Sequence, residues 1–235
     1  MKSYEVSDKV KSKLLLLIDL HLDYEKLEND IYGSEYDELQ DKYERKYIEI
    51  NDKIDKIVNS KENIKLTPEE MKKYDIKEEC ESKEIEDYWE KVIINSRFFT
   101  ITDKDKKILK YLTKVKLVKL PEKFYDFRVD FYFKQNDYFR NKILSKEYIY
   151  GKDSILKKAK GTLIDWKSPD KNATIEKVIK KIKKGNKYID EIKEKQVDSF
   201  FSFFVDVDNM KLVNNEETFF KEDLFLNQLE YYLIL

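Results

Sequence analysis

The chain has 235 residues, of which 41% are hydrophobic and 40% are charged, so it is long enough to bury a substantial core. Its formal net charge is only −1, yet residues 1–60 carry 15 acids and 10 basic side chains, residues 152–195 carry 14 lysines and 7 acids, and residues 196–235 carry 8 acids and 2 lysines. One cysteine, one histidine and four glycines exclude an internal disulfide, a multi-histidine metal site and a glycine-rich phosphate loop.

These absences also bear on the class of protein. No spacing of the many carboxylates singles out an acid–base pair, so we expect no enzymatic activity, no cofactor and no metal. The first ten residues, MKSYEVSDKV, lack the apolar stretch of a signal peptide, and the apolar run at residues 14–18 is too short to span a bilayer. We therefore expect a soluble intracellular protein.

The first 60 residues predict one long amphipathic helix. Apolar residues recur at steps of three and four, which places them on one helical face. Roughly 55 helical residues would make a rod of about 80 Å, longer than the body that the remaining chain can fold, so the stripe needs a helix from a second chain. The alternative is a break near Gly33 with the two halves folded back as a hairpin. The predicted dimerisation residues are Val10, Leu14, Leu17, Tyr24, Ile31, Leu39, Tyr43, Tyr47, Ile50 and Ile54.

Residues 61–235 predict an α+β body. Thr67 followed by Pro68 and Glu70 is typical of a helix start with a capping box. Residues 85–96 predict a short amphipathic helix, and Asp103 is placed to cap the next helix.

Period-two alternation of apolar and polar side chains then predicts four strands. They are expected at residues 114–120, 124–133, 146–151 and 161–167, in a four-stranded antiparallel sheet with flanking helices. Residues 168–195 are rich in lysine and predict a projecting hairpin, either of helices or of strands.

The stretch DSFFSFF at residues 198–204 places four phenylalanines within five positions. Asp198 or Ser199 is placed to cap a short helix there. We expect the rings to pack on Phe127, Phe131 and Phe133 of the sheet rather than to form an exposed binding patch. A helix and an apolar tail are expected to close the chain.

Six segments together resemble the nucleosome assembly protein family. In chain order they are EDYWEKVIINS, LKYLTKV, RVDFYFKQNDYFRNKILSKEY, LIDWK, DSFFSFF and LEYYLIL, and the last is more similar to the SET (template-activating factor) branch. The resemblance runs from about Glu84 to Leu235. It implies a homodimer joined by the long helix of residues 1–60, with an "earmuff" domain at residues 61–235. It also implies a histone chaperone of nucleus and cytoplasm that binds core histones through acidic surfaces, assists nucleosome assembly and disassembly, and uses no ATP.

On this resemblance, the histone-facing acids are expected after the phenylalanines, at Asp206, Asp208, Glu216, Glu217, Glu222 and Asp223. The family is strongly acidic and usually ends in a long acidic tail, whereas this chain is near neutral and stops at Leu235. The acids must then gather on one face, or binding is weak.

A lysine run in the predicted hairpin has two interpretations, a nuclear import signal or a solvated face. Its members are Lys180, Lys181, Lys183, Lys184 and Lys187. Direct nucleic-acid binding is disfavoured because the flanking segments are acidic. Two other functions stay open: a coiled-coil adaptor, and a protein inhibitor of a phosphatase or of histone acetylation.

Overall fold

The computed structural model describes residues 8–27, 33–60, 65–77, 85–120, 126–151, 155–184, 187–208 and 213–234. The chain divides into two compact units, residues 1–52 and residues 53–235. We call the first unit the arm and the second the body. Among the described residues, no helix is long and apolar enough to cross a membrane.

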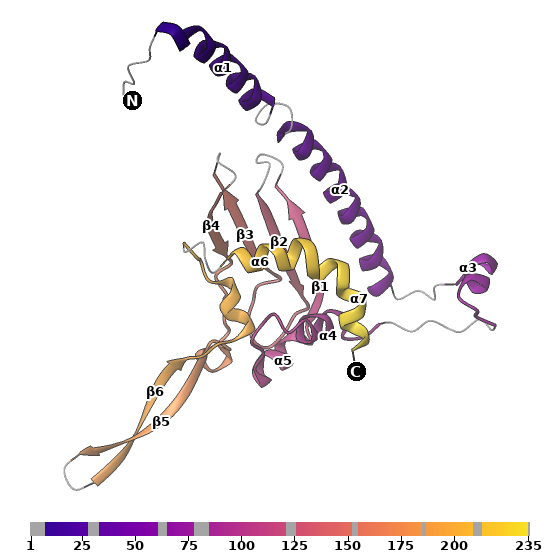
Figure 1. Ribbon diagram of the computed structural model, residues 1–235. Coiled ribbons are helices and arrows are strands. Elements are labelled where there is room, and N and C mark those ends of the chain that lie inside the picture. Colours follow the sequence, from indigo (N-terminus) through magenta and orange to yellow (C-terminus); the bar gives the residue numbers. More distant parts are fainter. Residues whose placement is uncertain are drawn as a thin grey trace. The chain divides into compact units, whose positions relative to one another are not determined.

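The arm is helical. It contains α1 (Asp8–Lys26) and most of α2 (Gly33–Val58), shown in Figure 1. Residues 28–32, which would join α1 to α2, lie outside the described residues, so the single long helix of residues 1–60 stays a prediction. Two surface pairs four residues apart lie on these helices. His21 and Glu25 approach to 3.3 Å between Nε2 and Oε1, and Arg45 forms an ion pair with Asp41 of the kind that stabilises a helix by about 0.3–0.5 kcal/mol.

The last turns of α2 belong to the body. Val58 is buried in the core of the body, and Asp55 forms an ion pair with Lys114 of the sheet. The remaining elements, in chain order, are α3 (Pro68–Lys73), α4 (Tyr88–Asn95), α5 (Asp103–Leu109), β1 (Leu112–Lys119), β2 (Phe127–Phe133), β3 (Ile143–Tyr150), β4 (Leu156–Gly161), η2 (Pro169–Lys171), β5 (Ile175–Lys184), β6 (Lys187–Gln196), η3 (Phe200–Phe204), α6 (Asn214–Thr218), η5 (Phe219–Leu224) and α7 (Phe225–Leu233).

The body is built on a four-stranded antiparallel sheet, as the sequence predicts. Its strands run in the order β1-β2-β3-β4, so each strand pairs with its neighbour in the chain. The register places Phe131 opposite Leu144 and Phe127 opposite Tyr148, and all four side chains are buried. One face of the sheet is therefore apolar, and this face carries the core.

The prediction for the fourth strand is wrong in position. The strand is β4, which ends at Gly161, whereas the sequence predicts residues 161–167. A Cβ on Gly161 would lie 1.8 Å from the carbonyl oxygen of Phe204, so only glycine allows η3 to pack this closely on the strand. Thr162 still donates its N–H to the carbonyl of Ser145 in β3, but beyond it the chain leaves the sheet, and Trp166 forms an isolated bridge to Phe139.

The four phenylalanines of η3 are core residues, which confirms the prediction. Each is no more than 8% exposed. Phe131 of β2 contacts three of these rings at centroid distances of 5.4–5.8 Å, in edge-to-face geometry. Each such ring pair adds about 0.5–1.5 kcal/mol beyond burial of apolar area. Phe133 approaches Phe201, whereas Phe127 stacks on Tyr148 instead.

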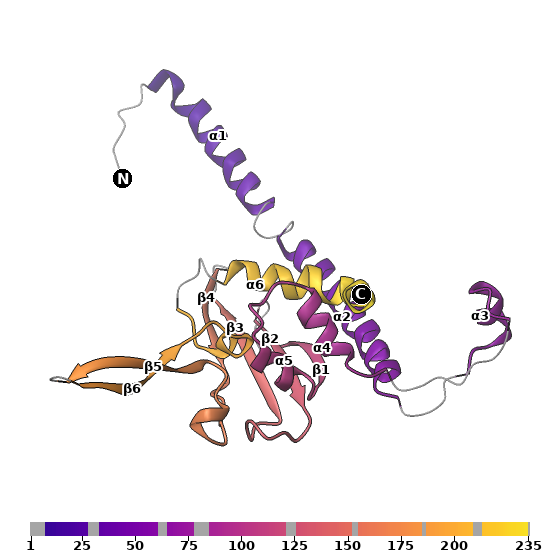
Figure 2. The same ribbon diagram turned by 90° about the horizontal axis from the view of Figure 1, so that it is seen from below.

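The C-terminal elements α6, η5 and α7 follow one another and lie across the apolar face of the sheet (Figures 1 and 2). Phe220 of η5 is fully buried and lies 6.1 Å from Phe131, centroid to centroid. At the far end α7 packs on α4, where Tyr88 lies against Tyr232 and donates a hydrogen bond to Gln228. The helix expected at the end of the chain thus covers one side of the core.

The predicted helix cap is confirmed at α3 but is wrong at α5. Thr67 and Glu70 form the predicted capping box at the start of α3. At α5, however, the cap is Thr102 and not Asp103, because the Thr102 hydroxyl accepts the N–H of Asp105 while the Asp105 carboxylate accepts the N–H of Thr102. Asp105 is fully buried and also accepts hydrogen bonds from the hydroxyl and backbone at Ser199–Phe200.

After the short η2, the predicted hairpin consists of strands rather than helices. β5 and β6 form a separate two-stranded antiparallel sheet in continuous register from Ile175 opposite Gln196 to Lys184 opposite Lys187. Its base carries half-buried Ile175 and Val197.

Candidate functional site

The predicted acids lie on two segments of the body. The first segment follows η3 and pairs with the edge strand β4, since Val207 and Ala159 exchange two backbone hydrogen bonds of 2.8 and 3.0 Å. Asp206 accepts the N–H of Gly161 at 2.9 Å. Lys158 lies 3.9 Å from Asp206 and 3.3 Å from Asp208, and the two acids stay 56% and 79% exposed. Asp206 and Asp208 thus lie at the surface, and Lys158 is close to both carboxylates.

Glu216 differs from the other predicted acids because it points into the body. Its carboxylate lies 2.9 Å from Nζ of Lys146 and accepts a hydrogen bond of 2.8 Å from the hydroxyl of Tyr148. The Lys146 side chain is only 2% exposed and its ammonium lies 4.3 Å from the ring centre of Phe203. Burial lowers the pKa of Lys146, while the charge of Glu216 opposes that shift. Glu216 therefore forms a buried ion pair with Lys146 that joins α6 to β3.

The remaining three acids lie on α6 and η5. Glu217 pairs with Lys221 at 3.1 Å, and the Lys221 ammonium lies 4.5 Å over the ring of Phe127. Asp223 is half-buried and accepts hydrogen bonds from the hydroxyl of Tyr231 and the amide of Asn227. Glu222 is exposed. Of the six acids, Asp206, Asp208 and Glu222 therefore have the open carboxylates that a basic partner could reach.

The predicted dimerisation stripe is exposed in the single chain. Among its described side chains, Leu17 is 60%, Tyr24 is 61% and Leu39 is 53% exposed, and the others of the arm lie between 37% and 52%. Ile54 is the exception, since it is partly buried against the core of its own body. The side chain of Val10 and the whole of Ile31 lie outside the described residues.

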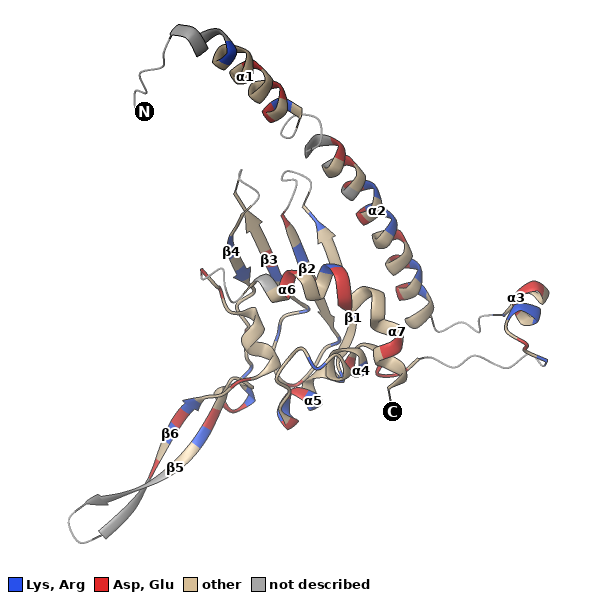
Figure 3. Cartoon of the chain, in the orientation of Figure 1, with Lys and Arg blue, Asp and Glu red and all other residues tan. Residues whose placement is uncertain are grey.

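The predicted lysine run lies on the β5–β6 hairpin, although its side chains lie outside the described residues. The backbone register places Lys180 opposite Glu191 and Lys181 opposite Asp190. The register therefore places acidic positions of β6 opposite lysine positions of β5. Figure 3 shows the same interleaving of acids and bases along α2.

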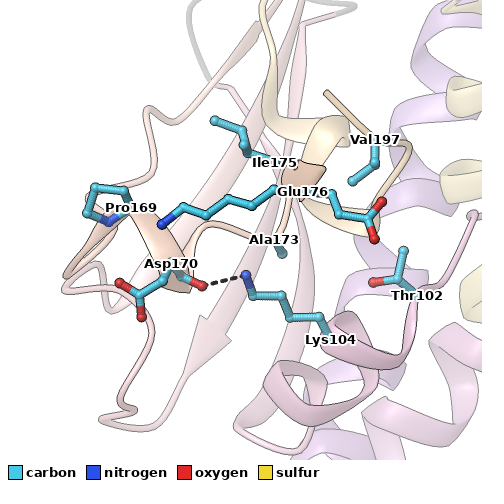
Figure 4. A pocket seen from close by; sticks show the side chains of 9 residues that line it. Thr102, Lys104, Pro169, Asp170, Ala173, Ile175, Glu176 and Val197 are labelled. Atoms are coloured by element: carbon cyan, nitrogen blue, oxygen red, sulfur yellow. Dashed lines mark hydrogen bonds between the residues drawn. The ribbon is translucent and has the colours of Figure 1, made fainter. Parts of the chain in front are cut away.

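A hollow of about 400 Å³ lies at the base of this hairpin (Figure 4). Lys104 of α5 reaches across it and donates hydrogen bonds of 2.7 Å to the carbonyls of Asp170 and Asn172. The other charged residues that line the hollow are Lys177, Asp170 and Glu176, so it has two cations and two acids. Among the described residues, no group of three or more metal-ligating side chains occurs.

The comparisons with known proteins now decide the family. The model of the nucleosome assembly protein (NAP) family matches residues 12–233. This chain belongs to the nucleosome assembly protein family. Nucleosome assembly protein 1;1 of Arabidopsis thaliana is 34% identical over 202 residues, covering 83% of this chain and 54% of that protein. Nucleosome assembly protein 1;4 of Nicotiana tabacum is 31% identical and covers 85% of this chain and 57% of its own length. The chain spans about half the length of these curated relatives.

Solved structures agree on the fold. Nucleosome assembly protein 1 from Plasmodium knowlesi is 22% identical, covers 98% of this chain and 99% of its own, and superposes with a TM-score of 0.71. Nucleosome assembly protein S from Plasmodium falciparum is 18% identical and superposes with a TM-score of 0.57, covering 94% of this chain and 99% of that one. The family and the α+β fold predicted from the sequence are thereby confirmed, while the SET branch stays a prediction.

Two structural features of this NAP-family body were not predicted from the sequence. The first is the Lys146–Glu216 pair, whose members are 70 positions apart and carry no local signal. The second is Asp105, which the pattern T-x-x-D at residues 102–105 could have marked as the second half of a capping box.

Proposed function

We propose that this protein is a histone chaperone that binds core histones through acidic surfaces and assists nucleosome assembly and disassembly without ATP. The observation that carries the proposal is the match of the family model to residues 12–233, which covers arm and body together. The names of that family and of the relatives above refer to nucleosome assembly. The fold adds support, because both the body and the helical arm of the family are present.

Binding to histones would be electrostatic and reversible. Core histones are basic, and the open carboxylates Asp206, Asp208 and Glu222 offer complementary charge on the body. Exposed charges attract a basic partner at long range but are screened by salt, with a Debye length of about 10 Å at 0.1 M. The near-neutral net charge predicts weaker histone binding than a strongly acidic chain would show.

A titration with purified histones tests the proposal. Each of the two kinds of core histone pair is titrated separately into the full chain at several salt concentrations, without nucleotide. We expect binding at low micromolar strength or better that weakens with salt. A chain that ignores both kinds of histone pair at low salt is instead a coiled-coil adaptor or an inhibitor, and the proposal is then wrong.

We further propose that the active form is a homodimer joined by the arms. Leucines and tyrosines more than half exposed along α1 and α2 are unfavourable in water, at about 25 cal/mol per Å² of apolar surface. A second arm that packs on this stripe would cover them as a two-stranded coiled coil covers its seam. Ile54 would contribute less than the others, because its own body already covers part of it.

We propose that the protein acts in both nucleus and cytoplasm, with the hairpin lysines as an import signal. The run Lys180, Lys181, Lys183, Lys184 and Lys187 lies on a ribbon of its own sheet, where substitutions leave the core of the body untouched. A tagged chain with these five lysines changed to serine should lose nuclear accumulation while its melting temperature stays constant. Unchanged distribution would assign the run to a solvated face.

A further inference from the structure

A second hollow, of about 320 Å³, lies beside the loop that joins β2 to β3. Unlike the hollow at the hairpin base, its lining contains four cations and no acid. The full lining is Phe133, Lys134, Gln135, Asn136, Phe139, Arg140, Asn141, Lys142 and Lys167. Volumes of about 300–1,000 Å³ with an apolar floor and a few convergent polar groups are typical of ligand sites.

The loop around this hollow is held by its own hydrogen bonds. The amide oxygen of Asn136 accepts the backbone N–H groups of Tyr138 and Phe139 at 2.9 and 3.0 Å. Lys167 donates to the carbonyl of Asn136 at 2.5 Å. The floor is set by Phe139, which is 2% exposed and packs on Trp166. The wall is therefore preorganised, which reduces the ordering cost of binding.

The four cations are not equally available. Lys167 is engaged by the loop, and Arg140 pairs with Asp165 through a contact of 2.9 Å at the surface. Lys134 and Lys142 are exposed and make no ion pair within the part of the chain that the structure describes. Asp137, in the same loop, is exposed and does not line the hollow. Two exposed lysines without an ion pair and a third cation thus line one concave site.

We propose that this hollow binds a phosphate-bearing ligand through Lys134, Lys142 and Arg140. Phosphate oxygens suit this set, because lysine serves as a point charge and arginine offers a planar fork of donors for the same anion. The phosphate can come from a free oligophosphate or from the backbone of a nucleic acid. The site is separate from the acids proposed to bind histones, so it does not rest on that function.

The test uses the full chain and two phosphate probes at low ionic strength. Inorganic tripolyphosphate and a short DNA duplex are each titrated in, with amide chemical shifts as the readout. We expect shifts at residues 133–142 and at Lys167, and at least a tenfold loss of affinity in Lys134→Gln/Lys142→Gln. If DNA is the source, its binding should fall linearly in log salt, and the variant should flatten that slope by about two.

A matched control removes two exposed lysines elsewhere on the body, in Lys72→Gln/Lys107→Gln, with the same change of net charge. Binding close to that of the unmodified chain is expected. Equal losses in both variants would show diffuse charge attraction and overturn the proposal, as would the absence of binding by both probes. Binding of poly-glutamate alone would reassign the hollow to an acidic peptide. Histone titration of the same variants reports on the proposed chaperone function separately.

Discussion

Arm and body differ in how much of their apolar surface the single chain covers. The body buries the phenylalanines of its core almost completely, with Phe131 and Phe200 at 0% exposure. The arm leaves Leu16 at 64% and Leu20 at 64%. The first unit has helices without a core, and the second has a core closed by α6, η5 and α7. The body is thus stabilised by its own packing, whereas the exposed apolar stripe of the arm is the ground for the proposed dimer.

Charge placed on the arm should break the proposed dimer, which is the largest effect we expect. In Leu17→Asp/Ile50→Asp, each carboxylate would enter the apolar seam at a cost of several kcal/mol. Sedimentation equilibrium should show a monomer with an intact body, judged from near-UV circular dichroism. The control Leu163→Asp alters a leucine of the body that is 90% exposed and should leave the dimer unchanged. A monomeric unmodified chain at micromolar concentration contradicts the dimer.

The ion pair inside the body gives the next largest effect. Glu216→Gln keeps the acceptor for Tyr148 but leaves Lys146 buried without a counter-charge, which typically costs about 3–5 kcal/mol. The double variant Lys146→Met/Glu216→Gln removes the charge as well and should recover most of that loss. Urea unfolding gives the free energy of unfolding of the unmodified chain, the single variant and the double variant. A double variant no more stable than the single one would show that Lys146 needs no partner.

This pair also shows where sequence reasoning stops. In sequence Glu216 and Glu217 are indistinguishable, yet one enters the core and the other pairs along its helix with Lys221. Only the tertiary fold decides this, because the partner Lys146 lies on β3. The six predicted acids consequently do not form one equivalent set.

Strand prediction succeeded where one face is apolar and failed where it is not. Along β2, Phe127, Val129, Phe131 and Phe133 alternate with polar residues, and the pattern located the strand. The edge strand β4 buries only Leu156 and Ala159 among lysines, so its alternation is faint. The fourth strand was therefore predicted at the more apolar stretch that follows Gly161, although most of that stretch lies outside the sheet.

Alkaline pH should weaken the contact between α4 and α7. Burial, aided by the neighbouring Tyr232, raises the pKa of Tyr88 to about 12. Since the folded state holds the phenolic proton more tightly than the unfolded one, this stability is present below pH 10 and is lost as the pH rises toward 12. The loss is at most about 2–3 kcal/mol. Urea midpoints at pH 9 and pH 11 should differ less in Tyr88→Phe. An unchanged difference would assign the loss to other tyrosines.

The smallest effect on stability, and the sharpest on binding, concerns the open acids of the body. In Asp206→Asn/Asp208→Asn the side chains keep their size, and the introduced amide oxygen at position 206 can still accept the N–H of Gly161, so unfolding free energy should change by less than about 0.5 kcal/mol each. Histone affinity should fall and its salt dependence should flatten, because exposed rim charges act through the long-range field. The matched arm variant Glu38→Gln/Glu49→Gln removes two exposed acids of α2 and should bind nearly as the unmodified chain does. If the arm variant loses histones while the body variant keeps its affinity and salt slope, the histone site lies on the helix, and the body's acids serve only its own structure.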